Sequence, residues 1–264
     1  MSKMPIPESD RVIYGKNPLE QVICQVRFPP ILKIEAEIPA TFQDQIRSSF
    51  PMFNVSQPLI SGIEIPSELA KLAGTAFGSS RTYEFSSEDR QWKLTLSKES
   101  FALACSQYPQ WENFKPRFAE PFVALIHDYA PSFVSRIGLR YRNVIRRSAL
   151  NLEGVKWSEL LREEIAGELH SDLADLVVDS NHQILMRLPD RGSVRILHGV
   201  GNDQNNEPCY LIDNDFFFDQ KIEADNAISL LDYFHGNSGK LFRWCIKQRL
   251  HDAMEPQVLH HQHC

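Results

Sequence analysis

Residues 136–147 read Arg136-Ile137-Gly138-Leu139-Arg140-Tyr141-Arg142-Asn143-Val144-Ile145-Arg146-Arg147 and lie near the middle of a chain of 264 residues. One side of this stretch carries Ile137, Leu139, Tyr141 and Ile145, and the other carries Arg136, Arg140, Arg142 and Arg146. Alternation with a period of two is typical of a strand that buries one face. We therefore predict a strand with one apolar side. Its other side is the arginine strip, our name for Arg136, Arg140, Arg142 and Arg146.

The elements predicted before this strand repeat after it in type and order. The preceding patterns indicate a strand at 17–28, a helix at 39–50, a loop at 54–80 with a short helix at 67–73, hairpin-linked strands at 81–86, 91–97 and 100–106, and a helix at 114–129. The following patterns indicate a helix at 157–169, a strand near 175–179, strands at 181–188, 193–200 and 209–218, and helices at 224–235 and 239–254. Gly236 is expected to end the first of these two helices, directly after His235.

This order predicts an α+β fold of two tandem strand-helix-strands-helix units. Antiparallel meanders with helices on one face belong to that class, so the units should form one large sheet, or two packed sheets, covered by helices on one face. The predicted boundaries are an N-terminal arm at 1–16, a first unit at 17–133, a second unit at 134–254 and a C-terminal tail at 255–264.

Composition places the chain among soluble globular proteins. It is 42% apolar and 23% charged, and its net charge of −6 argues against a general nucleic-acid binder. The first ten residues lack the apolar core of a signal peptide, and no stretch has the length of a membrane span. The five cysteines are widely spaced and odd in number, which is typical of reduced, buried thiols. We therefore expect a cytoplasmic protein without a membrane partner.

Several phrases carry a resemblance to a known family. They are Asn17-Pro18-Leu19 followed by CQVRFPPIL at 24–32, RIGLRY at 136–141, and YLID at 210–213. Together they resemble a sporadically distributed bacterial protein family. The resemblance brings no established activity, substrate or catalytic residue. Patchy occurrence of such a family implies a component of an accessory or mobile gene cassette, including phage defence. The histidine-rich end of the chain is not part of the family pattern.

The arginine strip has two interpretations. Same-face neighbours on a strand are about 6.6 Å apart, so Arg140 and Arg142 could grip adjacent phosphates of a nucleic acid or another anion. Alternatively, Asp213 and Asp215 alternate along the strand at 209–218 and could pair with the arginines, because unlike charges on facing strands attract. The acidic charge of the whole chain favours ion pairing.

Metal and cofactor chemistry receives little support. Asp213 and Asp215 could share Mg²⁺, but the sequence does not show the third ligand that a metal enzyme needs. A soft metal could bind His260, His261, His263 and Cys264, but a terminal tail lacks the supporting contacts of a true site. Nucleophile-elbow, phosphate-loop and His-Glu-x-x-His motifs are absent from the sequence. We predict no cofactor.

The sequence favours a non-enzymatic cytosolic interaction or regulatory module that binds a protein partner or a second copy of itself. The alternative is a ligand-, anion- or nucleic-acid-binding domain, or a metal-dependent enzyme. Such a domain would use a concave sheet face lined by Arg140, Arg142, Asp213 and Asp215, and would need a pocket of several hundred cubic ångströms with convergent polar groups.

Overall fold

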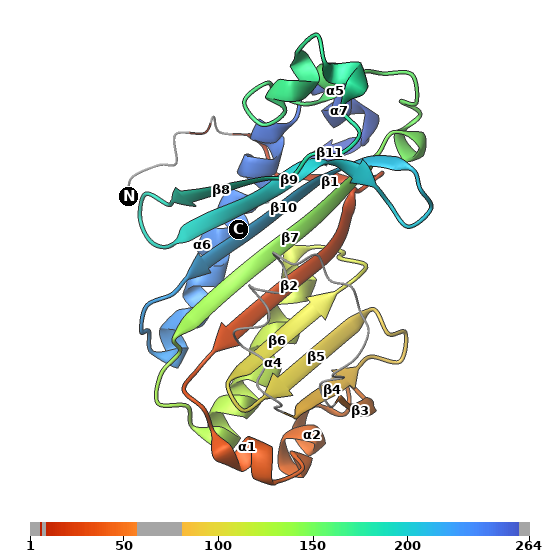
Figure 1. The fold of residues 1–264 in the computed structure, drawn as a ribbon. Coiled ribbons are helices and arrows are strands. Elements are labelled where there is room, and N and C mark those ends of the chain that lie inside the picture. The colour runs from red at the N-terminus through yellow and green to blue at the C-terminus, as the bar shows by residue number, and fades with distance from the viewer. Residues whose placement is uncertain (1–5, 7–8, 57–80, 259–264) are drawn as a thin grey trace.

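The computed structural model describes residues 6, 9–56 and 81–258, and these are called the described residues below. Its main feature is a nine-stranded antiparallel sheet with the strand order β3-β4-β5-β6-β2-β7-β10-β9-β8 (Figure 1). The strands are β2 (Leu19–Arg27), β3 (Met52–Ser56), β4 (Thr82–Ser86), β5 (Trp92–Ser97), β6 (Ser100–Cys105), β7 (Arg136–Arg146), β8 (His182–Arg187), β9 (Ser193–Asn202) and β10 (Pro208–Phe218). A separate two-stranded sheet pairs β1 (Val12–Tyr14) with β11 (Pro256–Val258).

The helices differ greatly in length. They are α1 (Leu32–Ala36), α2 (Ala40–Ile46), α4 (Trp111–Tyr129), α5 (Trp157–Leu160), α6 (Ala224–Cys245) and α7 (Gln248–Ala253), with short 3-10 turns η1 (Ser148–Leu150), η2 (Gly167–His170) and η3 (Ala174–Leu176). The two long helices, α4 and α6, lie on the same face of the sheet (Figure 1). None of the helices among the described residues has the length and apolar character needed to cross a membrane.

The core lies between these two helices and the sheet. Phe118 and Phe122 of α4 are fully buried and pack against Phe101 of β6, with ring centroids 5.6 and 6.2 Å from that of Phe101. Each buried aromatic ring of this kind contributes roughly 1.5–3 kcal/mol of hydrophobic stabilisation. The helix spacing that brings these rings to one side of α4 therefore fixes which face of the sheet is covered.

The central strand prediction is confirmed, and so is the α+β class with a large antiparallel sheet. Ile137, Leu139 and Ile145 of β7 are completely buried on the helix side. The two-sheet alternative is wrong, because β2 and β7 pair directly and join all nine strands into one sheet. The cysteine prediction holds for the described residues, where Cys24, Cys105, Cys209 and Cys245 are buried and unbonded to one another.

Two helix predictions are wrong. The first concerns α6, which continues through Gly236 and Gly239. An added Cβ at either glycine would meet nothing within 4 Å, and burial of the apolar side of α6 outweighs the weak helix propensity of glycine. The second concerns 157–169, where α5 ends at Leu160. Leu161 is extended and bridges Ile246, so tertiary pairing interrupts the helical pattern.

Smaller differences occur toward the sheet edges and chain ends. The edge strand β3 was not predicted, and it overlaps the start of the loop predicted at 54–80. A strand was predicted near 175–179, but Ala174–Leu176 forms the 3-10 turn η3. The predicted arm and tail meet as β1 and β11, because their backbones pair with each other. The short helix predicted at 67–73 and the cluster of His260, His261, His263 and Cys264 lie outside the described residues.

Candidate functional site

The arginine strip lies on the face of the sheet that α4 and α6 leave uncovered. Its apolar neighbours on β7 point toward the helices, so the arginines point the other way. Asp213 and Asp215 of β10 share this open face, and their register partners on β7 are Arg142 and Arg140. The structure therefore brings all six sequence-predicted site residues onto one side of two adjacent strands.

Arg140 and Asp213 form the tightest pair of the strip. The Nε atom of Arg140 donates to Oδ1 of Asp213 at 2.8 Å, and Nη2 donates to Oδ2 at 2.5 Å. Two parallel charge-assisted hydrogen bonds of this kind are strong and directional. The pair runs diagonally, since Asp213 lies directly opposite Arg142. Asp213 is only 3% exposed, so its carboxylate depends on this one guanidinium.

Asp215 has a more diffuse environment. It accepts one hydrogen bond from Nη2 of Arg136 at 2.8 Å. Burial raises the pKa of Asp215, and the charges of Arg136, Arg140 and Arg195 oppose that rise. Arg136 and Arg195 also lie over the ring of Phe217, at 5.1 and 5.5 Å from its centroid. This end of the strip is therefore a cation-rich aromatic cluster.

The other two arginines pair with carboxylates that the sequence did not identify. Glu20 of β2 accepts from Arg142 at 2.7 Å and from Arg146 at 2.6 Å. Arg146 also donates through Nε to Asp203 in the β9–β10 loop, at 2.6 Å. This contact lowers the pKa of Asp203, since the charged carboxylate is stabilised. Ion pairing of Arg140 and Arg142 with carboxylates is confirmed, but the partner of Arg142 is Glu20.

The sequence gives little indication that Glu20 and Asp203 pair with the arginine strip. Glu20 lies near the start of the strand predicted at 17–28, and only the β2–β7 pairing brings it beside Arg142. That pairing contains a register shift between Leu19 and Gln21, so a regular ladder would not place Glu20 correctly. Asp203 lies in a loop, whose position no periodic pattern predicts.

A cleft of about 880 Å³ opens at the Arg146 end of the strip. Among its lining residues are Glu20, Arg142, Arg146 and Asp203, together with Asn202 of β9. Arg140, Asp213 and Asp215 are not part of its lining. The cleft has the volume expected of a small-molecule site, but its arginines already hold carboxylates. It can therefore accept a polar group of mixed charge more readily than a bare anion.

The described residues do not support the metal alternative. Among them there is no cluster of three or more His, Cys, Asp or Glu side chains arranged to hold a metal ion. Asp213 uses both of its carboxylate oxygens on Arg140. A divalent cation at Asp213 and Asp215 would have to displace that guanidinium.

His235 lies in the middle of α6 and not at the helix end that was expected at Gly236. Its ring stacks on Trp111 at 4.6 Å with an interplanar angle of 10°, and Nδ1 is 2.9 Å from the hydroxyl of Tyr141. Burial, assisted by the charge of Arg11, lowers the pKa of His235 to about 4. The imidazole is therefore a neutral part of the packing between α4, α6 and β7.

Comparison of the chain with protein-family models gives no match, and comparison with curated proteins gives no significant match. The resemblance noted in the sequence therefore stays a prediction, and function has to be argued from the geometry of the open face.

Proposed function

We propose that this protein is a non-enzymatic interaction module that binds a protein partner through the open face of its nine-stranded sheet. The observation that carries the proposal is one continuous register row across all nine strands. Its members, from β8 to β3, are Leu185, Arg195, Asp215, Arg140, Ile23, Ala104, Lys93, Ser86 and Met52. We call this set the open row.

Every member of the open row is at least partly exposed. In the neighbouring row on the helix side, Ile196, Tyr141, Val22, Cys105 and Trp92 are all buried. Antiparallel register partners project from the same side of the sheet, so the contrast separates a covered face from an accessible one. A face of this breadth, with apolar groups between charges, has the composition of a protein–protein interface.

Charge pairing favours a protein over a nucleic acid. The four arginines of the strip are matched by four carboxylates, Glu20, Asp203, Asp213 and Asp215. Phosphate binding gains its free energy from cations that neutralise the backbone, and paired guanidinium groups have little net charge to offer. A protein surface that presents both signs can complement this face without breaking the pairs.

The test is capture of the tagged full chain from the cells that produce it, with matched surface variants. Leu185→Glu combined with Lys93→Glu changes one exposed residue in each half of the open row. Val123→Glu is the control, since Val123 of α4 is 58% exposed and Leu185 is 60% exposed. We expect a stoichiometric partner whose recovery falls at least roughly tenfold with the open-row variant and is unchanged with the control.

Three outcomes would contradict the proposal. One is recovery of no stoichiometric partner, with the chain monomeric by light scattering and active alone. Another is equal loss of the partner with Val123→Glu. The third is a homodimer that the open-row variant dissociates, which would assign the face to a second copy of this chain.

We further propose that the fold consists of tandem units at 17–133 and 134–254. The support is that β2 and β7 are neighbours at the sheet centre, and each pairs with the last strand of its own meander, β6 or β10, before the long helix α4 or α6. Because β1 pairs with β11, the chain ends can be joined. A circular permutant that begins at residue 134 should fold and keep partner binding, whereas an insoluble permutant would argue against this boundary.

A further inference from the structure

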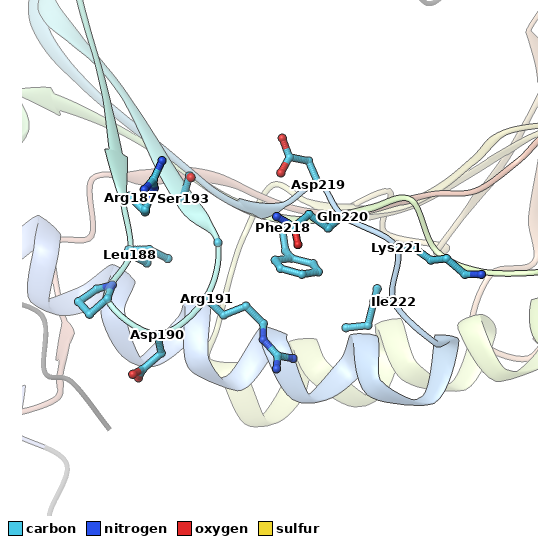
Figure 2. Close-up of a pocket in the computed structure, with 12 residues that line it drawn as sticks. Arg187, Leu188, Asp190, Arg191, Ser193, Phe218, Asp219, Gln220, Lys221 and Ile222 are labelled. Atoms are coloured by element: carbon cyan, nitrogen blue, oxygen red, sulfur yellow. The ribbon is translucent and has the colours of Figure 1, made fainter.

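A second cavity, of about 670 Å³, lies away from the cleft of the arginine strip, between the β8–β9 turn and the loop that leads from β10 into α6 (Figure 2). We call it the turn pocket. Figure 2 shows Arg191 reaching into this space from the turn, Phe218 and Ile222 facing it, and Asp219 and Lys221 pointing away from it. The pocket therefore has an apolar floor and a cation at its centre.

Both walls of the turn pocket are fixed by backbone hydrogen bonds. The N–H of Leu188 donates to the carbonyl of Gly192 at 2.9 Å and closes the turn. Gly192 has φ +89°, and an added Cβ would lie 2.5 Å from the carbonyl oxygen of Phe217, so only glycine fits there. On the other wall, Ile222 and Val134 exchange two hydrogen bonds of 3.0 Å. The pocket is thus formed before any ligand binds.

The charges of the turn pocket contrast with those of the arginine strip. Its lining contains three cations, Arg187, Arg191 and Lys221, against two carboxylates, Asp190 and Asp219. Among the described residues, none of these three cations has a carboxylate within ion-pair distance. Arg191 lies 5.8 Å from the ring centroid of Phe218, and Lys221 lies 4.9 Å from that of Phe133. These cations are oriented by aromatic rings and keep their hydrogen-bond donors available.

The positive end of the sheet extends beyond the pocket. Arg195 is the register partner of Asp215, and its buried Nε atom has no hydrogen-bond partner. Arg195 stands next along β9 from Ser193, which lines the pocket on the same side of that strand. The local field therefore attracts anions toward this end of the molecule, although the net charge of the chain is −6.

We propose that the turn pocket binds a small organic polyanion, a phosphate ester or a polycarboxylate, through Arg191. Its acidic group meets the guanidinium of Arg191 on the turn, while Lys221, whose ammonium lies over Phe133, adds only to the positive field around the pocket. Its organic part packs on Phe218 and Ile222. The volume is within the range of small-molecule sites. The lining of the turn pocket contains no member of the open row, so variants can test the two sites separately.

The experiment is isothermal titration of the full chain with pyrophosphate and, separately, with citrate, at constant ionic strength. The test variant is Arg191→Gln. The control is Arg47→Gln, which removes an exposed cation at the end of α2 that does not line the turn pocket. Thermal melts establish that each variant is folded. We expect saturable binding that weakens at least roughly tenfold in the test variant and is unchanged in the control.

The two probes distinguish the ligand classes. Binding of pyrophosphate alone assigns a phosphate ester, and binding of citrate alone assigns a polycarboxylate. The proposal is overturned if neither probe binds saturably up to millimolar concentration, or if Arg47→Gln weakens binding as much as the test variant. Loss of partner capture in the open-row variant, with anion binding intact, would show that the two sites are independent.

Discussion

Replacing Arg140 with alanine is the most direct measure of how the strip contributes to stability. Asp213 is 3% exposed and accepts two hydrogen bonds from Arg140, so the change leaves a buried carboxylate without its cation. Breaking a buried pair in this way costs about 3–5 kcal/mol. The side chain of Arg140 is 38% exposed, and water entering its place should reduce that cost. We therefore expect a loss of about 2–4 kcal/mol of unfolding free energy.

Arg142→Ala is the matched control on the same strand. Arg142 is 42% exposed and its partner Glu20 is 33% exposed, so water already screens this pair. Its removal should cost only about 0–1 kcal/mol. Urea unfolding followed by circular dichroism and by tryptophan fluorescence measures both variants, and agreement of the two signals checks that unfolding is two-state.

A double-mutant cycle isolates the interaction. Arg140→Ala, Asp213→Ala and the double variant should give a coupling of roughly 1–2 kcal/mol. The double variant should also be more stable than Arg140→Ala alone, because the unpaired carboxylate is gone. Equal losses for Arg140→Ala and Arg142→Ala, or additive effects in the cycle, would refute the view that Asp213 depends on Arg140.

Further predictions concern other parts of the fold. The pKa of His235 is about 4 in the folded state and about 6.5 in the unfolded state, so stability that is fully present above pH 6.5 is lost as the pH falls toward 4, by up to about 3 kcal/mol. The unfolding free energy from urea titrations between pH 7 and 4.5 should therefore depend less on pH in His235→Gln, and the same dependence in both proteins would contradict this. Gly199→Ala should destabilise the fold by roughly 3 kcal/mol or more, because the new Cβ would lie 1.9 Å from the carbonyl oxygen of Ser180. Gly236→Ala in α6 should be neutral or stabilising by about 0.5–1 kcal/mol, and similar melting temperatures for the two variants would contradict the close contact between Gly199 and Ser180. Burial raises the pKa of Cys245 to about 12, so a thiol reagent should modify it only after unfolding, and rapid native labelling would mean that this packing opens.

The sequence predicts the sheet better than the helices, for a physical reason. Alternation in β7 records burial on one side, and no competing pattern disturbs it. Helix ends were predicted from local propensity, which tertiary contacts override at Gly236 and at Leu161. The edge strand β3 escaped prediction because its residues are mostly exposed, so it has no buried face to produce alternation.

The candidate site was predictable to the extent that it depends on alternation within one strand. The strip and the two aspartates fall on one face, as their spacing indicates. The diagonal choice of Asp213 by Arg140 depends on the length and rotamer of the arginine, which register alone does not determine. To predict Glu20 as a partner, one would have to know the pairing of β2 with β7. To predict the turn pocket, one would have to know that two loops meet in space. Neither of these long-range contacts leaves a local pattern.

Charge pairing explains why an anion and a protein partner should use different parts of this sheet. An anion that binds the arginine strip must displace a carboxylate, and displacement at Arg140 would leave Asp213 buried without a cation. The exchange replaces one negative group with another, so it gains little attraction and adds a desolvation cost. Arg191 carries no such cost, because it does not have to release a carboxylate among the described residues. Anion binding should therefore occur at the turn pocket, while the neutralised strip remains available to a surface that carries both signs of charge.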